Sequence, residues 1–247
     1  MEVVSIAKVN YARAETRAIK SRNEFGLSNT ESINIFEVLK YNGEISIIKM
    51  PIESDLYGLF IKKGNAQAIL INTNNSLGRQ YFSAAHEYYH LKYEVNLNDD
   101  NEELEKEADT YASYFLMPRE GLNYHLKKRL TNKGKDTIDI SDCLYLENYF
   151  KISHHALVIR LKIDNHIGNN KFEQLLDVNI RKEANKYGYS LDLYTPIIQE
   201  KDILIESDYA ELAEIALDKE KISKSRYFEY LLEGGYEDIL YGNDQDE

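Results

Sequence analysis

Hydrophobic and polar positions recur with different periods in the two parts of the chain. Helical spacing of apolar residues predicts a helix over residues 3–24 and a short one over about 33–42. Runs rich in β-branched and aromatic residues then predict three strands, at 44–50, 56–61 and 66–72. Residues 63–65 are the hairpin turn before the last strand. The first part of the chain is therefore predicted to be a small sheet with helices packed on it.

Helical periodicity dominates the rest of the chain. The helices predicted there cover residues 79–94, 102–117, 118–133, 141–150, 153–161, 171–187, 207–219 and 223–233. Residues 96–101 are a loop between the first two of them. No apolar run approaches the roughly 20 residues that a membrane-spanning helix needs. Strands followed by a long run of helices predict the α+β class.

Two histidines in the helix predicted at 79–94 have the spacing of metal ligands. His86 and His90 are four residues apart, so they project from one face of the helix and can reach one ion. Glu87 completes the H-E-x-x-H arrangement and can take a proton from a water molecule on the open side of the ion. Three protein ligands and an open fourth position are typical of catalytic zinc. We therefore predict a zinc hydrolase site with Glu87 as the general base.

The next predicted helix, 102–117, is rich in carboxylates and offers candidates for the third ligand. Its buried stripe is expected to consist of Leu104, Ala108, Tyr111, Ala112, Phe115 and Leu116. Glu107 lies at the edge of this stripe, so we predict Glu107 as the third metal ligand. Glu103, one turn earlier on the same side, is the alternative. Asp109 either orients a ligand histidine through its second ring nitrogen or is a solvated helix acid.

These motifs together resemble the ImmA/IrrE family of zinc metallopeptidases. The resemblance rests on H-E-x-x-H at His86, on the approach Gly78–His86, and on Glu-x-Glu-Ala-Asp-x-Tyr-Ala-x-x-Phe-Leu-Met-Pro over Glu105–Pro118. It covers about residues 1–120. Tyr89 departs from the family pattern, in which a small residue is frequent before the second histidine, and Tyr111 stands where Phe is commoner.

The resemblance implies a fold, a cofactor and a substrate class. The fold is α+β, with a zincin-like metallopeptidase domain of a small β-sheet and active-site helices, followed by an all-helical C-terminal region. Zinc would be bound by His86, His90 and Glu107, and Glu87 would be the catalytic base. The substrate would be a protein, and in several members of the family it is a helix-turn-helix transcriptional repressor, whose cleavage is a stress or mobile-element switch.

Residues 141–161 resemble a helix-turn-helix, with Ser153 as the N-cap of the second helix. If His154, His155 and Arg160 are exposed, as we expect, contact with DNA bases is conceivable. One buried position of the second helix is either Ile159 or Arg160. The net charge of −12 and the scarcity of Arg and Lys in the second helix favour the alternative, a helical pair packed on the peptidase domain. DNA binding is therefore not the favoured interpretation.

Composition bears on the setting and on the domain organisation. Cys143 is the only cysteine, so the chain has no internal disulfide, and the N-terminus lacks the pattern of a secretory signal. We expect a cytoplasmic protein without a membrane partner. Three regions are predicted: a metallopeptidase domain at 1–120, a helix-turn-helix-like segment at 121–167, and an acidic helical region at 168–247.

The function predicted from the sequence is that of an intracellular zinc metalloendopeptidase that cleaves a protein partner. An alternative from another class is a regulatory protein that binds DNA or a partner and holds a structural or vestigial metal. Iron is an alternative metal, because two histidines and a carboxylate suit it as well.

Overall fold

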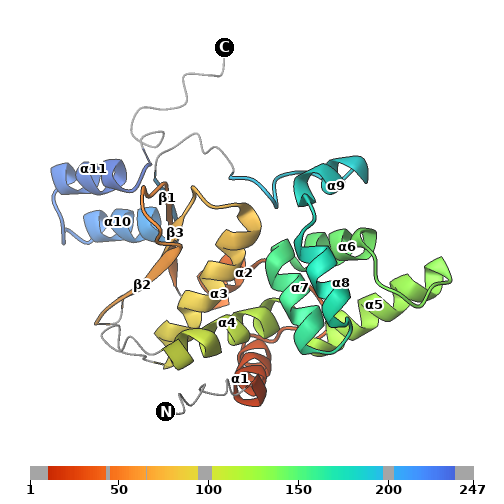
Figure 1. The fold of residues 1–247 in the computed structure, drawn as a ribbon. Coiled ribbons are helices and arrows are strands. Elements are labelled where there is room, and N and C mark those ends of the chain that lie inside the picture. Colours follow the sequence, from red (N-terminus) through yellow and green to blue (C-terminus); the bar gives the residue numbers. More distant parts are fainter. Residues whose placement is uncertain (1–10, 43–44, 65, 94–101, 197–202, 237–247) are drawn as a thin grey trace, which may run out of the picture.

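The computed structural model describes residues 11–42, 45–64, 66–93, 102–196 and 203–236 (Figure 1). The strands are β1 (Ser46–Met50), β2 (Gly58–Lys63), β3 (Ala66–Asn72) and β4 (Leu204–Glu206). The helices are α1 (Tyr11–Glu24), α2 (Ile35–Glu37), the π-helical turn η1 (Val38–Asn42), α3 (Leu77–Tyr93), α4 (Glu102–Leu116), α5 (Arg119–Lys133), α6 (Ile140–Phe150), α7 (His154–Ile163), α8 (Asn169–Leu176), α9 (Ile180–Lys186), α10 (Tyr209–Asp218) and α11 (Lys224–Glu233).

The four strands form one sheet in the order β2-β3-β1-β4. β1 and β3 are parallel, whereas β2 is antiparallel to β3 and β4 is antiparallel to β1. Ile47, Ile69 and Ile71 are fully buried, because strand alternation and register place all three on one face. α3 packs against β2 and β3 (Figure 1). The edge strand β2 therefore lies beside the helix that carries the two histidines.

Buried apolar side chains of the described residues form two large clusters and a small one, which contains Leu144 and Ala184. The first joins α1, α3, α4 and the sheet and includes Ala18, Ile69 and Phe115. The second joins α5, α6, α7 and α8 and includes Leu122 and Leu157. α4 contacts α1, α3 and α7, so this one helix connects the sheet-containing part to the helices that follow (Figure 1).

The α+β class is confirmed, with one correction to the region predicted to be all helical. β4 lies in that region and pairs with β1, so that Ile205 faces Ile48 across the sheet. The strand has only three residues, which is too short to show an alternating pattern. The C-terminal region therefore contributes to the sheet that supports the site.

Most of the predicted helices are present, and one is divided. Instead of a single helix over 171–187, α8 ends at Leu176, and the side chain of Asn179 caps α9 by accepting a hydrogen bond from the backbone N–H of Lys182. The predicted helical residues 3–10 and the predicted loop 96–101 lie outside the described residues.

The predicted helix-turn-helix segment has the expected backbone but not the expected surface. Ser153 caps α7 as predicted, and Lys151 adopts a left-handed conformation in the turn. His155 is exposed, whereas His154 and Arg160 are buried, at 8% and 1% exposure. The prediction of exposure was therefore wrong for these two residues. The side chains of His154 and Arg160 hydrogen-bond to residues of neighbouring helices, which agrees with the alternative of a packed helical pair.

His154 makes stability depend on pH. Its Nδ1 lies 2.6 Å from a Glu147 carboxylate oxygen and its Nε2 lies 2.8 Å from the Leu175 carbonyl oxygen, so both nitrogens donate only when the ring is protonated. Burial lowers the pKa of His154, but the Glu147 hydrogen bond and charge outweigh it, and the pKa is raised. The stabilising contribution is then full below the unfolded pKa and is lost as pH rises through the folded pKa.

His154→Gln is expected to lower the free energy of unfolding by about 1–3 kcal/mol at about pH 6, and by less at about pH 9. Urea denaturation across this pH range measures the effect, and His155→Gln, an exposed neighbour, is the control. A His154→Gln deficit that does not shrink at high pH would contradict this account.

Candidate metal centre

His86 and His90 lie one turn apart on α3 and point to a common position. Their Nε2 atoms are 3.0 Å apart. His90 is buried and stacks on the ring of Phe60 from β2, with 6.2 Å between the ring centres. The edge strand thus helps to orient the second histidine. The two nitrogens are held side by side, as the four-residue spacing predicts.

Glu105 of α4 completes a three-residue cluster. One carboxylate oxygen lies 3.2 Å from His86 Nε2 and the other lies 3.2 Å from His90 Nε2. Ligand atoms about 2.0 Å from a tetrahedral zinc ion are separated by about 3.3 Å, so the three side chains fit such an ion. In the part of the chain that the structure describes, no other group of three His, Cys, Asp or Glu side chains converges in this way.

Asp109 supports the cluster from the outside. Its carboxylate lies 2.9 Å from His86 Nδ1, which it holds as an N–H donor so that Nε2 keeps its lone pair for a metal. Burial lowers the pKa of His86, but hydrogen bonds to Asp109 and Glu105 outweigh burial and raise this pKa to about 10. For His90, burial and the positive charge of His86 lower the pKa. Two carboxylates thus make the position favourable for a cation, and protons compete with a metal for it.

The structure does not bring Glu107, the third ligand predicted from the sequence, to the histidines. Its carboxylate is 1% exposed and accepts hydrogen bonds of 2.8 Å from Arg13 Nε and Arg17 Nη1, both on α1. Residues two apart on a helix lie about 200° apart around its axis, so Glu105 and Glu107 face opposite sides of α4. The expected buried stripe exists except for Leu104, which is half-buried, and it packs on α1 and the core. Glu103, the alternative ligand, lies one turn before Glu107 and shares its side of α4.

The spacing of the acids was the signal that sequence reasoning missed. Glu105 and Asp109 are four residues apart, just as His86 and His90 are, so each pair presents one face of its helix to the other. Both acids are more than half exposed, whereas Glu107 is buried. A ligand at the rim of the interface between α3 and α4 remains open to solvent, as a catalytic metal site requires.

Glu87, the predicted general base, packs against the edge strand β2. A Cβ atom placed on Gly58 of β2 would lie 3.0 Å from Glu87 Cγ and 3.2 Å from the Leu70 carbonyl oxygen. Burial raises the pKa of Glu87; the His86 charge opposes this and the Glu105 charge adds to it. A glutamate with a raised pKa is a better proton acceptor near neutral pH.

Tyr89 and Tyr111, the two departures from the family pattern, pack in the core. Tyr89 is fully buried, and its hydroxyl lies 2.6 Å from Arg17 Nη1, so its extra bulk is directed toward α1. Its ring lies 5.2 Å from that of Tyr111. The Tyr89 ring also lies edge-on to the ring of His90, with 5.6 Å between the ring centres, so Tyr89 packs beside this histidine as well as against α1.

A small sheet packed on a helix with H-E-x-x-H, beside a second helix that supplies a carboxylate, defines the zincin-like class of metallopeptidase folds. Residues 44–162 match the family model described as Peptidase_M78, IrrE N-terminal-like domain. This segment is therefore a domain of the ImmA/IrrE family, as its motifs predicted, and it supports a metallopeptidase-type function. No curated protein matches the sequence.

The matched segment contains β1, β2, β3 and α3, and it extends through α6 and most of α7. It thus includes both helices of the candidate metal site. Among the described residues, no helix is long and apolar enough to cross a bilayer.

Proposed function

We propose that the chain is a zinc-dependent metalloendopeptidase of the cytoplasm, with His86, His90 and Glu105 as metal ligands and Glu87 as the general base. The observation that carries the proposal is the convergence of two imidazole nitrogens and a carboxylate within 3.0–3.2 Å of one another. Zinc bound there would polarise the scissile carbonyl and make a water molecule acidic near neutral pH.

The protein side chains divide the remaining work. Asp109 holds the His86 ring in the tautomer that leaves Nε2 free. Glu87 takes a proton from the attacking water molecule and delivers it to the leaving amine. Its seat beside Gly58 keeps the carboxylate on the side of α3 that faces the edge strand.

The substrate is proposed to bind as an extended segment along β2. This strand is at the edge of the sheet, and Phe60 at its middle stacks on His90. An extended peptide can hydrogen-bond to an edge strand as a further strand, which would bring its backbone past the ligands. We propose a helix-turn-helix repressor as this substrate, on the family resemblance. The net charge of −12 favours encounter with a basic, DNA-binding partner.

Two assays test the proposal. Protein purified without added metal is analysed for zinc and iron. Zinc-loaded protein is then incubated with a proteome-derived peptide library and with a helix-turn-helix repressor, chosen from the genes that neighbour the gene of this chain. We expect zinc-dependent cleavage of both, which a chelator stops and added zinc restores. Zinc-loaded protein that cleaves neither would contradict the peptidase function and favour a regulatory protein with a structural metal.

Gly58→Ala is expected to lower kcat about 10- to 100-fold without changing zinc affinity, because the added methyl group displaces Glu87 but touches no ligand. Cleavage rates and a competitive zinc titration measure the two quantities. The matched control is Gly168→Ala, because a Cβ there meets nothing within 4 Å. Equal kcat values in the two variants would show that Gly58 does not position the base.

A further inference from the structure

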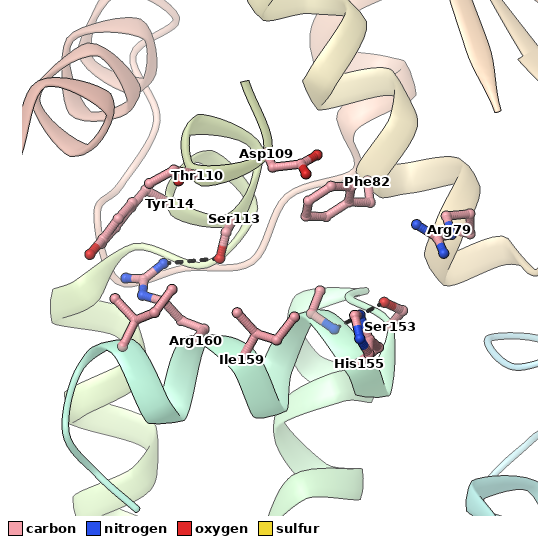
Figure 2. Close-up of a pocket in the computed structure, with 12 residues that line it drawn as sticks. Arg79, Phe82, Asp109, Thr110, Ser113, Tyr114, Ser153, His155, Ile159 and Arg160 are labelled. Atoms are coloured by element: carbon pink, nitrogen blue, oxygen red, sulfur yellow. Dashed lines mark hydrogen bonds between the residues drawn. The ribbon is translucent and has the colours of Figure 1, made fainter. Parts of the chain in front are cut away.

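A cavity of about 190 Å³ lies beside the metal centre, between α3, α4 and α7. Figure 2 shows Phe82 of α3 and Asp109 and Ser113 of α4 on one side of it, with Ile159 of α7 opposite. Its volume exceeds the roughly 150 Å³ of an apolar cavity that binds benzene. The cavity can therefore hold an aromatic or branched aliphatic side chain.

The cavity adjoins the proposed active site. Asp109 forms part of its wall and also hydrogen-bonds to His86. Phe82 precedes His86 by four residues on α3, and Ser113 follows Asp109 by four on α4, so the cavity is displaced by one turn, about 6 Å, along each helix. Side chains of an extended peptide reach this far from a bond held at the metal.

The lining of the cavity favours an apolar side chain and disfavours a basic one. Phe82, Ala156 and Ile159 make an apolar body. Arg79 and Arg160 lie at opposite ends (Figure 2). Asp109, the acid of the wall, is engaged by His86. A basic side chain would meet two like charges, whereas an apolar one would bury its surface against the walls.

Arg160 fixes the inner end of the cavity. It is 1% exposed; its Nε donates to Asp164 at 2.7 Å and its Nη1 to Ser113 Oγ at 3.3 Å. Its Nη2 has no hydrogen-bond partner among the described residues. A buried guanidinium held in this way presents its unpaired Nη2 as a hydrogen-bond donor at the end of the cavity.

We propose that this cavity is a specificity pocket of the peptidase and takes a bulky apolar side chain, of Leu, Met or Phe size, from a residue that flanks the scissile bond. This inference rests on the proposed function. It makes the junction of α7 with α3 and α4 a determinant of which peptide bonds are cut, although α7 supplies no metal ligand.

Cleavage profiles of pocket variants test the proposal. Zinc-loaded wild-type protein is expected to cut a proteome-derived peptide library with Leu, Met or Phe enriched at one position and Lys and Arg depleted there. Ala156→Phe fills the pocket. It should reduce the cleavage of peptides with Phe at the selected position about 10-fold or more relative to peptides with Ala there. Ile159→Ala enlarges it and should shift the preference from Leu toward Phe and Tyr. Val158→Ala, a buried residue of α7 outside the pocket, should leave the profile unchanged.

The outcomes separate the pocket from the peptidase function. Cleavage with the same profile in all variants, or a wild-type preference for Lys or Arg, would overturn the pocket alone. If zinc-loaded wild-type protein cuts nothing, the proposed peptidase function is wrong, and the pocket is then tested by the binding of a small apolar ligand. N-acetyl-phenylalaninamide should then perturb the NMR signals of Phe82 and Ile159 in wild-type protein and not in Ala156→Phe. Absence of this binding would overturn the pocket as well.

Discussion

Glu87→Gln is expected to reduce cleavage of the peptide library and of the repressor by about 10²- to 10⁴-fold, with zinc content unchanged. The amide has the shape of the carboxylate but cannot accept the proton of the attacking water molecule. Glu87 is not within the group formed by His86, His90 and Glu105, so the metal should stay in place. Initial cleavage rates, together with elemental analysis of the same protein, measure both effects.

The control for this variant is Glu120→Gln, which removes an exposed carboxylate from the first turn of α5. It should cleave at the wild-type rate. If Glu87→Gln cleaves at that rate too, Glu87 is not the base. If the biological effect of the protein also survives the substitution, the regulatory alternative without proteolysis becomes the better account.

Glu105→Gln and Glu107→Gln should affect different properties, zinc affinity and stability respectively, although the residues are only two positions apart. Glu105→Gln removes a proposed ligand, so zinc affinity should fall at least about 100-fold, with little change in the stability of the metal-free protein because this side chain is 57% exposed. Glu107→Gln leaves Arg13 and Arg17 opposite a neutral amide and should cost about 2 kcal/mol of unfolding free energy, with zinc affinity retained.

Zinc titration and urea denaturation of both variants decide between the two carboxylates. The reverse pattern, with zinc lost in Glu107→Gln and retained in Glu105→Gln, would restore Glu107 as the ligand. Equal effects on both quantities would show that the pair acts through the packing of α4 and not through separate roles.

The sequence predicts the helices that form this site better than it predicts which face of each helix meets which neighbour. The spacing of His86 and His90 depends only on α3 itself, so it could be predicted. The choice among the acids of α4 depends on which of its faces meets α3 and which meets α1. Arg13 and Arg17, which bind Glu107, lie some 90 residues away in sequence, so the sequence does not indicate that they are its partners. The expected burial of Glu107 could therefore be interpreted as a sign that it binds a metal.

The same limit explains the helix-turn-helix segment. The helices and the Ser153 cap follow from local residues, and they are present. The burial of His154 and Arg160 follows from partners such as Leu175 and Ser113, which come from other helices. The strand β4 is a third case, because it is stabilised by pairing with β1, about 155 positions earlier.

The central claim is tested most directly by a crystal structure of the zinc-loaded protein with anomalous diffraction measured at the zinc absorption edge. The account predicts a single strong peak about 2.0–2.2 Å from His86 Nε2, His90 Nε2 and a Glu105 carboxylate oxygen, with Glu107 still bound to Arg13 and Arg17. A peak bound by other residues, or no peak at these histidines in zinc-saturated protein, would contradict it.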